Sequence, residues 1–319
     1  MQYTALSWSR RGFSWRFFQV LRHLRHRGVR CAVVFHDAET YFGNRLIDRV
    51  RRAVQLYTMR SAWSLADLSI FTIPPEKIPW LSAPAHKTVF IPVGANLPSE
   101  KLAGQTSNAR KDAPPTVAIY SLSPGHVGAE EIKSIADAAL FAAERIGPLR
   151  LLVLGRNSEL ALPPLKERLG NAPVEVSVRG ILPADEVVRS LGSCDVMLFV
   201  RGAISTRRGS AIAGIACGLP VIGCQGWETA SPLTKAGVVL AQPHEPNNFG
   251  SALVRVLSDS SLRAELAKQS REAYSCYFSW DVIAAQFVEA MRGHGAKPHA
   301  QNNHSEHATS AGASGHPEH

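Results

Sequence analysis

The residues best suited to bind an anion lie together between Ser205 and Gly223. The order of residue types there predicts a loop, a helix that begins near Gly209, a tight turn and a buried strand. Arg207 and Arg208 come immediately before the expected helix, whose first backbone N–H groups lack partners and whose dipole is positive at that end. Two guanidinium groups beside the N–H groups of Gly209 and Ser210 predict a site for a phosphate or a diphosphate.

The expected helix is rich in small residues, which leaves two interpretations of the segment open. In the first, the small side chains let a ligand or a neighbouring strand come close to the helix backbone. In the second, an arginine pair on the surface precedes an ordinary core helix. The small residues are Ala211, Ala213, Gly214 and Ala216.

Short apolar segments alternate with helical patterns along the chain, and this order predicts parallel sheets with helices on both faces. A polar segment at 99–115 with Gly, Ser, Asn and a Pro pair predicts a linker, so residues 1–98 form one expected domain. Its expected helices are 14–28 and 46–64, and its expected strands are 31–35, 68–72 and 88–92.

The second expected domain covers residues 116–276, and a helix at 277–292 and a polar tail at 293–319 follow it. The tail has no apolar pattern, so we expect it to be disordered. The expected strands of the domain are 117–120, 149–154, 174–178, 195–200, 221–224 and 238–240, and its further helices are 130–146, 184–192, 248–257 and 261–274.

Polar and glycine residues follow several of these strands, at the edge of a parallel sheet where ligands bind. Gly125, Gly155 and Arg156 lie at such positions in the second domain. Because the carboxyl ends of parallel strands meet at one edge, we expect these residues to line the same cleft as the arginine pair. The cleft would then hold a ligand against Arg207 and Arg208.

Three further side chains at strand ends have two interpretations each. His36 is either a hydrogen-bond partner of a reacting group or a structural histidine that caps the strand at 31–35. Asp37 is expected to cap the next turn rather than to orient His36. Glu228 follows the strand at 221–224 and is either a ligand contact or a solvated loop carboxylate.

The net charge of +9 belongs to the first part of the chain. Residues 1–60 contain 12 Arg, no Lys and 3 acidic residues, whereas the remainder has 23 basic and 23 acidic residues. The basic, aromatic helix at 14–28 fits an interfacial helix on anionic lipid, and equally a core-packing helix with solvated arginines. Nucleic-acid binding is not expected, because no recognition motif accompanies the charge.

Composition and cysteine usage favour a cytoplasmic globular protein. The 319 residues suffice for two modest domains, and the 45% hydrophobic content is ordinary for such proteins. No apolar run approaches ~20 residues, and the first residues lack a signal-peptide pattern. The scattered cysteines predict neither a zinc site nor a disulfide framework. They are Cys31, Cys194, Cys217, Cys224 and Cys276.

Short motifs follow one another in a specific order in both domains. Those of the second domain are Leu152–Arg156, Val178–Pro183, Leu191–Val196, Ala213–Gly223, Gly237–Leu240, Leu262–Leu266 and the C-terminal pattern Phe278–Ala284. The first domain has the strand end Phe35–Asp37 and the linker entry Ile91–Asn96. This order resembles family-4 glycosyltransferases: the second domain resembles their nucleotide-sugar-binding domain, the first resembles their acceptor domain, and Phe278–Ala284 resembles their C-terminal crossover helix.

The resemblance implies a GT-B fold, in which two Rossmann-type parallel-sheet domains face a cleft. The first domain is short for the family, whose full acceptor domain would begin with a strand and a Gly-rich turn ahead of Met1. We therefore expect an incomplete first domain, in either a truncated reading frame or a reduced family member. The implied site has the catalytic residues His36, Arg207 and Arg208 and the donor-binding residues Gly125, Gly155, Arg156, Ser205, Arg207, Arg208, Gly209, Ser210 and Glu228.

The implied activity is transfer of a hexosyl or related group, with retention, from a nucleoside diphosphate sugar to a glycan or lipid-linked acceptor. Such a reaction belongs to cell-surface polysaccharide or glycolipid synthesis, in the cytoplasm or on the inner face of the cell membrane. No cofactor is expected, and no metal is required, because the arginine pair supplies the positive charge and the sequence has no D-x-D pair.

The chain departs from the family pattern at three positions. The family usually has two glutamates eight residues apart, which align with Ser205 and Ala213, and a lysine that aligns near Val127. Arg207 and Arg208 are therefore expected to meet the diphosphate charge. One alternative is a non-catalytic module that binds a sugar nucleotide or a partner. Another is a nucleotide-sugar epimerase, which the transferase-like C-terminal pattern disfavours.

Overall fold

The computed structural model describes residues 1–81, 87–98, 113–243 and 245–293. Within them the chain forms two parallel β-sheets, each covered by helices, as the alternating pattern predicts. Most of the expected linker at 99–115 and nearly all of the expected tail at 293–319 lie outside the described residues.

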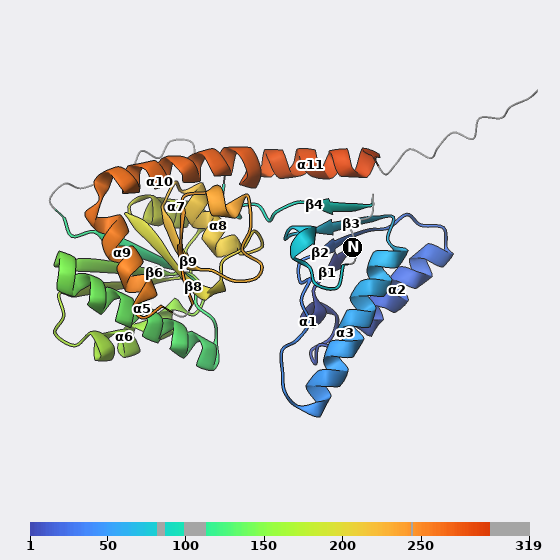
Figure 1. The fold of residues 1–319 in the computed structure, drawn as a ribbon, viewed down its shortest axis with the longest axis horizontal. Helices are drawn as coiled ribbons and strands as arrows, with labels where there is room; N and C mark the ends of the chain where they lie inside the picture. Colours follow the sequence, from blue (N-terminus) through green and yellow to red (C-terminus); the bar gives the residue numbers. More distant parts are fainter. Residues whose placement is uncertain (82–86, 99–112, 244, 294–319) are drawn as a thin grey trace, which may run out of the picture.

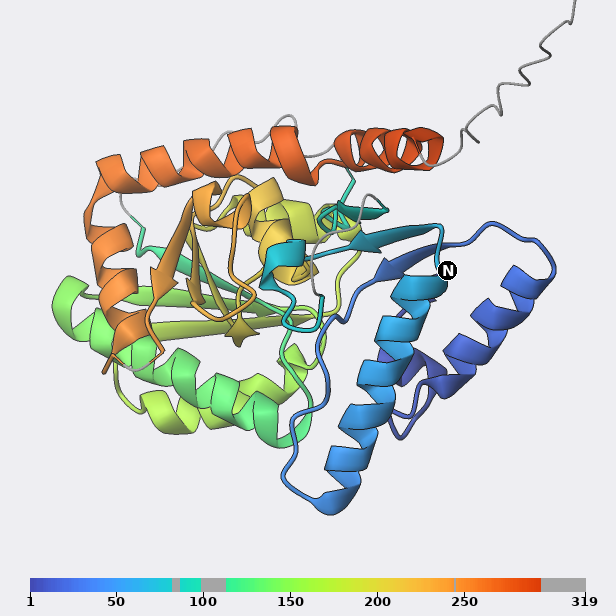
Figure 2. The ribbon, with the colours of Figure 1, turned by 45° about the vertical axis from the view of Figure 1, so that its right-hand side comes forward.

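The first sheet has four parallel strands in the order β1-β2-β3-β4. Two long helices, α2 and α3, lie side by side against it (Figures 1 and 2). Its elements are β1 (Gln2–Tyr3), α1 (Ala5–Trp8), α2 (Trp15–His26), β2 (Ala32–Phe35), α3 (Leu46–Leu65), β3 (Leu68–Phe71), η1 (Pro75–Lys77) and β4 (Thr88–Phe90).

Aromatic packing holds this first sheet to its helices. The rings of Phe35 and Phe71 stack with centroids 4.6 Å apart, and Tyr3 meets Phe17 of α2 edge-on at 5.0 Å. Phe17 and Leu21 are fully buried, so the apolar side of α2 faces the core. The sequence left an interfacial helix and a core-packing helix open for this segment. Phe17 and Leu21 pack in the core, as the second interpretation predicts, while Trp15 and Val20 stay exposed, and lipid binding by α2 stays a prediction.

The second sheet has six parallel strands in the order β10-β9-β8-β5-β6-β7. This is the doubly wound order in which the direction of strand addition reverses between β5 and β8. Its elements are β5 (Thr116–Tyr120), α5 (Gly125–Ile146), β6 (Leu149–Leu154), η2 (Ser158–Ala161), α6 (Leu162–Leu169), β7 (Val174–Gly180), α7 (Ala184–Gly192), β8 (Val196–Ala203), α8 (Gly209–Ala216), β9 (Val221–Cys224), η3 (Leu233–Lys235), β10 (Val238–Ala241), α9 (Asn248–Ser258), α10 (Ser260–Ala273) and η4 (Tyr274–Phe278).

Helix α5 begins at Gly125, five residues before the start that the apolar pattern predicts. The extra turn is stabilised by the buried carboxylate of Glu131, which accepts a hydrogen bond from the Ser123 N–H at 2.7 Å. A Cβ at Gly128 would lie 2.1 Å from the Ser123 carbonyl oxygen, so the helix and the preceding loop approach too closely for any other residue. The early start brings the N-terminus of α5 close to the carboxyl end of β5.

The C-terminal helix α11 (Trp280–Gly293) runs from the second domain across the first sheet (Figure 1). Its buried Ile283 and Ala290 belong to one apolar cluster with Leu68, Ile70 and Ile91 from the first domain. The first sheet is therefore covered by α2 and α3 on one face and by α11 on the other.

The small residues of α8 serve close packing against strands. A Cβ at Gly214 would lie 2.6 Å from the Met197 Sδ and 3.2 Å from the Val221 Cγ2, on β8 and β9. At Gly209, the first residue of the helix, a Cβ would meet no atom of the described residues within 4 Å. The two interpretations therefore apply to different parts of the helix. Around Gly214 the helix packs against strands as a core helix does, while its start at Gly209 is accessible to a ligand.

Gly214→Val is expected to lower the free energy of unfolding by about 2 kcal/mol, because the new side chain must displace core atoms. Gly209→Ala in the same helix is the matched control and should raise it by about 0.5 kcal/mol, since alanine loses less backbone entropy. Urea titration of both variants measures the difference. Equal effects of the two substitutions would contradict the packing described for α8.

Candidate functional site

The loop between β8 and α8 is fixed between the two domains by Thr206. The Thr206 hydroxyl donates to the Thr72 carbonyl at 2.6 Å, and the Thr206 carbonyl accepts from the Val93 N–H at 3.0 Å. Thr206 is fully buried, so these bonds are made without competition from water. They hold Arg207 at the boundary of the two domains.

The carboxylate of Glu228 lies between both arginines. It accepts from the Arg207 Nε at 2.5 Å and from the Arg208 Nη2 at 3.1 Å. Glu228 is only 2% exposed, and a buried carboxylate of this kind is stable when paired charges and hydrogen bonds replace its water. The carboxylate thus serves as the counter-charge of the arginine pair, and its burial rules out the solvated loop carboxylate that the sequence left open. The predicted contact of Glu228 with the donor stays a prediction.

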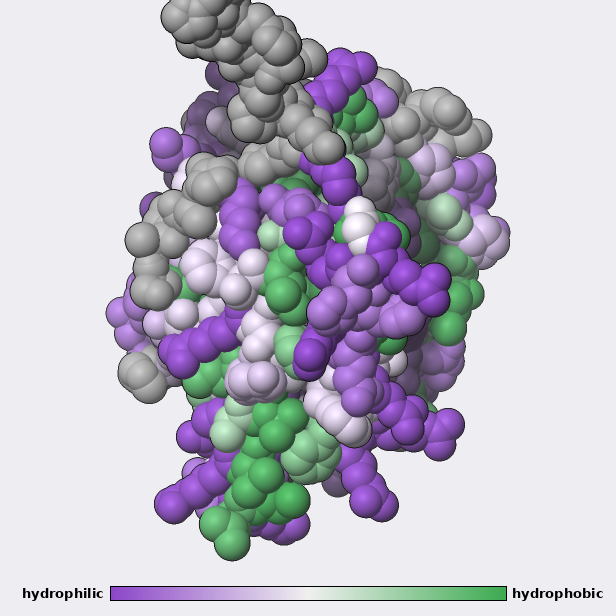
Figure 3. Space-filling view, turned by 90° about the vertical axis from the view of Figure 1, so that its right-hand side faces the viewer, coloured by the Kyte–Doolittle hydropathy of each residue, from purple (hydrophilic) through white to green (hydrophobic). Residues whose placement is uncertain are grey.

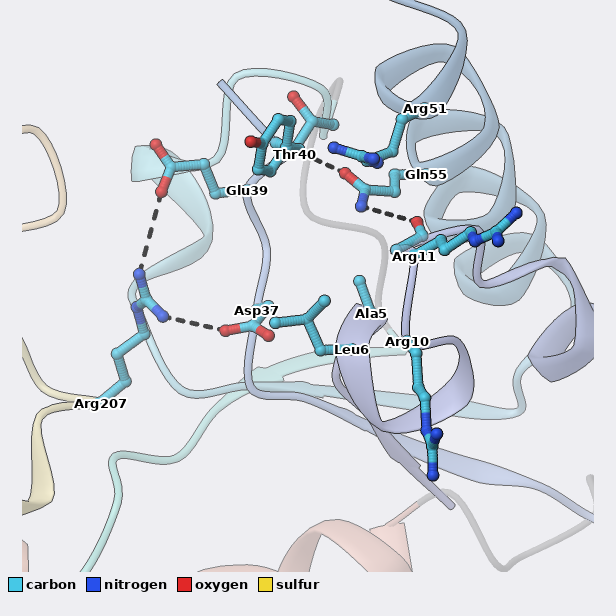
Figure 4. A pocket seen from close by; sticks show the side chains of 12 residues that line it. Ala5, Leu6, Arg10, Arg11, Asp37, Glu39, Thr40, Arg51, Gln55 and Arg207 are labelled. Atoms are coloured by element: carbon cyan, nitrogen blue, oxygen red, sulfur yellow. Dashed lines mark hydrogen bonds and ion pairs between the residues drawn. The ribbon is translucent and has the colours of Figure 1, made fainter. Parts of the chain in front are cut away.

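Arg207 also reaches into the first domain (Figure 4). Its Nη1 donates to the Asp37 Oδ1 at 3.0 Å, and its Nη2 lies 3.9 Å from the Glu39 Oε2. All three nitrogens of its guanidinium therefore face carboxylates. Asp37 pairs with Arg207, whereas the sequence favoured a turn cap, because the strand end that carries Asp37 faces the loop of the other domain.

Glu39 and Trp227 form a second contact across the domain boundary, which the sequence did not predict. The Trp227 indole donates to the Glu39 Oε1 at 3.0 Å. Burial and the nearby Glu228 carboxylate raise the pKa of Glu39. The only signals in the sequence were the positions of both residues, just after the strand end at Phe35 and just before Glu228.

Arg208 has more free hydrogen-bonding capacity than Arg207. Within the described residues only its Nη2 has a partner, its Nε is buried without one, and its side chain is 31% exposed. Burial and the neighbouring Arg207 lower the pKa of Arg208, yet the Glu228 carboxylate opposes this and helps to keep it charged. Arg208 is thus a cation with unused donors beside the start of α8.

Two helices begin at the point where the sheet order reverses, and neither has a side-chain cap. Helix α8 follows β8 and helix α5 follows β5. A Cβ on the first residue of either helix, Gly125 or Gly209, would meet nothing within 4 Å in the described part of the chain. Both helix ends therefore present unpaired N–H groups and positive dipole ends at accessible positions, which suit an anion.

Gly155 and Arg156 lie after β6, beside the β5 loop. Gly155 has a φ of +89°, and a Cβ there would lie 2.5 Å from the Ser121 Oγ, so glycine is needed for the backbone. The N–H of the exposed Arg156 donates to the same Ser121 Oγ at 3.3 Å. The predicted donor-binding role of both residues stays a prediction.

Ser205 and Ser210 occupy different environments on the two sides of the arginine pair. Ser205 is fully buried and its hydroxyl oxygen has no hydrogen-bond partner in the described residues. Ser210 is half-buried in the first turn of α8. Ser210 therefore lies where the sequence expected it, at the helix start, while the Ser205 side chain is enclosed in this conformation.

A pocket of about 330 Å³ lies beside Arg207 in the first domain (Figure 4). Asp37 and Glu39 line it at the Arg207 side, and Arg51 of α3 lines it on the other side. Tyr41 also lines it, and its ring lies under the Arg51 guanidinium. His36, at the end of β2, is half-buried next to Asp37 in the sequence. The structure thus joins the arginine loop to the carboxyl edge of the first sheet through Asp37 and Glu39.

The fold is similar to several solved glycosyltransferase structures. WaaG, a glycosyltransferase involved in lipopolysaccharide biosynthesis, has a TM-score of 0.61 and 16% identity over 88% of this chain and 83% of its own. Anabaena HepE in complex with UDP and glucose has a TM-score of 0.57 and 15% identity over 87% of this chain and 75% of HepE. The chain has a GT-B fold. The apo form of the lipopolysaccharide outer core galactosyltransferase WaaB shares this fold. Its TM-score is 0.55, and its identity is 16% over 91% of this chain and 82% of WaaB.

At the sequence level, no family model and no curated protein match the chain. Among the described residues, no helix is long and apolar enough to cross a membrane. No group of His, Cys, Asp and Glu in those residues has the arrangement of a metal site.

Glu228→Ala is expected to lower the free energy of unfolding by about 3 kcal/mol, because it leaves the partly buried Arg208 guanidinium without its counter-charge and removes one carboxylate partner of Arg207. Glu175→Ala is the control, since it removes an exposed carboxylate paired with Arg150 and should cost less than about 1 kcal/mol. Chemical denaturation measures both values. A loss for Glu228→Ala no larger than for the control would show that the buried pair does not stabilise the fold.

Burial lowers the pKa of His36, and the nearby Asp37 only partly offsets this. On acidification the unfolded chain therefore takes up the proton first, so stability is lost as pH falls from about 6.5 through the lowered pKa. We expect His36→Asn to reduce the loss of unfolding free energy between about pH 7 and pH 5. Urea titrations of both proteins at both pH values test this. If the variant loses as much unfolding free energy as the wild type, His36 is not the group responsible for the pH dependence.

Proposed function

We propose that this GT-B protein is a glycosyltransferase that uses a nucleoside diphosphate sugar as donor. The observation that carries the proposal is the pair of uncapped, accessible helix starts at Gly125 and Gly209, on either side of the reversal point of the sheet. Diphosphates bind at helix starts in doubly wound sheets, because N–H groups and dipoles there favour negative charge. Arg208 adds a guanidinium at the same place.

The proposed chemistry follows from the charge that develops on the leaving diphosphate. As the bond between the anomeric carbon and the diphosphate oxygen breaks, negative charge grows on that oxygen. The Arg208 guanidinium and the N–H groups of Gly209 and Ser210 would stabilise it, and such prepared donors are an effective source of catalysis. No metal is required for this step. Retention at the anomeric carbon and transfer of a hexosyl group are what the resemblance to family 4 implies.

On the acceptor side, we assign the pocket beside Arg207 to the incoming glycan or lipid-linked sugar. It adjoins the arginine loop through Asp37 and Glu39, which lie beside Arg207. His36 would form hydrogen bonds to the reacting sugar or to the acceptor hydroxyl. Such a reaction would serve the synthesis of a cell-surface polysaccharide or glycolipid, in the cytoplasm at the membrane surface. The support for this part is the position of the pocket and the fold shared with WaaG, HepE and WaaB.

One observation favours a second candidate, a non-catalytic GT-B module that binds a sugar nucleotide. The carboxylates of Glu228, Asp37 and Glu39 outnumber the two guanidinium groups that they contact. A ligand must therefore compete for Arg207 with carboxylates of the protein itself. Turnover separates the candidates: release of nucleoside diphosphate from a donor sugar requires the enzyme, and tight binding without any release would favour the module.

Arg208→Ala is expected to weaken nucleoside diphosphate binding by roughly 10- to 100-fold, since bonds to a charged group contribute about 1.5 to 3 kcal/mol. Arg207→Ala should weaken it less, because the Arg207 guanidinium already has carboxylate partners. The matching nucleosides should bind all three proteins alike. Calorimetry with UDP, GDP and ADP, each against its nucleoside, measures these losses. Equal losses for nucleosides and diphosphates would overturn the diphosphate site.

A further inference from the structure

The pocket beside Arg207 has two ends that differ in charge (Figure 4). At the domain boundary it is lined by Asp37 and Glu39, whose carboxylate oxygens lie 3.0 and 3.9 Å from guanidinium nitrogens of Arg207. The Trp227 indole also donates to Glu39. Two carboxylates beside one guanidinium leave this end rich in acceptor oxygens and without a positive excess. Such an end suits the hydroxyl groups of a sugar ring, which donate hydrogen bonds to carboxylates.

The other end of the pocket is positive. Arg51 lines it from α3, and Arg10 and Arg11 line it from the segment that follows α1. Asp48 pairs with Arg51, but it is only 6% exposed and does not line the pocket, so it offsets one of the three positive charges. Arg10 and Arg11 are exposed and make no ion pair with any described residue. This end therefore has positive charge to offer an anionic group.

The Arg51 guanidinium is held in place at this wall of the pocket. Its central carbon lies 4.4 Å from the centroid of the Tyr41 ring, and its Nη1 donates to the Asp48 Oδ1 at 3.0 Å. The buried Gln55 accepts from the Tyr41 N–H and donates to the Gly12 carbonyl, so both loops around the pocket are tied to α3. The Arg51 Nε is buried without a partner, and its Nη2 makes no hydrogen bond within the described residues. A fixed guanidinium with an unused nitrogen loses little entropy when it binds an anion.

Positive charge alone does not distinguish the pocket, because arginines are common throughout the first domain. Figure 3 shows the side of the molecule that lies to the right in Figure 1, and hydrophilic side chains cover much of it, with a hydrophobic patch at its lower end. Arg16 and Arg27, near the two ends of α2, are exposed but do not line the pocket. What distinguishes the pocket is the order of charges across about 330 Å³, with carboxylates at one end and guanidinium groups at the other.

We propose that this pocket binds an anionic saccharide, which is a sugar that carries a carboxylate or a phosphate group. The anionic group would contact the Arg51 Nη2, with Arg10 and Arg11 beside it, while ring hydroxyls would donate to Asp37 and Glu39. A neutral sugar would leave the arginine end without an anionic partner, and a bare anion would leave the carboxylate end without a donor. Hydrogen bonds between charged groups are the stronger ones, so the anionic group supplies most of the affinity.

The order of charges also sets the orientation of the bound saccharide. A hydroxyl would lie at the Asp37 end, next to the arginine loop, and the anionic group would lie at the far end, beside Arg51. This step rests on the proposed function, which assigns the pocket to the acceptor: the orientation keeps the negative charge of the acceptor away from the diphosphate of the donor, where like charges would repel. Binding of the saccharide itself does not depend on catalysis.

Titration of the full-length protein with glucose 6-phosphate, glucuronic acid and glucose, followed by nuclear magnetic resonance, tests the proposal. At least one of the two anionic sugars should bind about tenfold more tightly than glucose, and more weakly at high salt. The tighter of the two shows whether the pocket prefers a phosphate or a carboxylate. Glucose that binds as tightly as both anionic sugars would overturn the proposal, as would inorganic phosphate that binds as tightly as glucose 6-phosphate.

The double variant Arg10→Gln with Arg11→Gln should weaken binding of the anionic sugar by about tenfold, since two charged partners are lost. The matched control is Arg16→Gln with Arg27→Gln, which removes the same charge from exposed positions outside the pocket and should bind as the wild type does. All four arginines are exposed, so thermal unfolding should be unchanged in both variants. Equal losses in the two variants would mean that only the overall charge attracts the sugar, which would overturn the pocket.

A last comparison separates this pocket from the donor site, where an anionic sugar could also bind. Arg208→Ala should keep the affinity for the anionic sugar and lose affinity for UDP, GDP or ADP, and the Arg10 and Arg11 variant should do the reverse. The opposite pattern would move the sugar to the donor site and overturn the proposal. Failure of the wild type to bind any nucleoside diphosphate, with the anionic sugar still bound, contradicts the proposed function alone.

Discussion

The buried carboxylate of Glu228 is the interaction on which the site depends. It lies in a low-dielectric environment where an unpaired charge would be very costly, so Arg207 and Arg208 must stay beside it. Its position after β9 and theirs after β8 therefore tie two neighbouring strand ends together. Asp37 extends the same set of ion pairs into the first domain. One set of charges thus fixes the arginine loop and joins the domains.

The two arginines have different environments, and this difference follows from where the loop lies. Thr206 is held by backbone atoms of the first domain, so the next side chain, Arg207, points toward the carboxylates of that domain. Arg208 is one residue closer to the helix and keeps donors without partners beside the accessible Gly209. An arginine that links domains and an arginine available to a ligand therefore arise from adjacent positions in one loop.

The first domain also has side chains that bond inside the chain next to side chains that stay exposed. Helix α3 uses its polar residues Asp48 and Gln55 inside, where they bond to loops of the chain, and leaves apolar residues outside. The apolar side of α2 is used in the core. The aromatic and basic character of both helices is visible in the sequence, but only the packing decides which of their apolar side chains are buried. Trp15 and Val20 of α2 are exposed, as are Leu46 and Val50 of α3.

The sequence by itself determined the alternating elements, because burial imposes periods of two and 3.6 residues that the side chains must follow. It also placed the arginine pair at a helix start, since loop, small-residue helix and strand are local signals. The short β1 could not be predicted, because it is stabilised by pairing with β2, which is distant in the chain. The first turn of α5 was missed because it depends on the buried Glu131 carboxylate rather than on an apolar pattern. Only the tertiary structure decided that Glu228 is a counter-charge and that Asp37 pairs with Arg207. Such pairs join residues as many as 170 positions apart, and no local pattern specifies which charges burial will bring together.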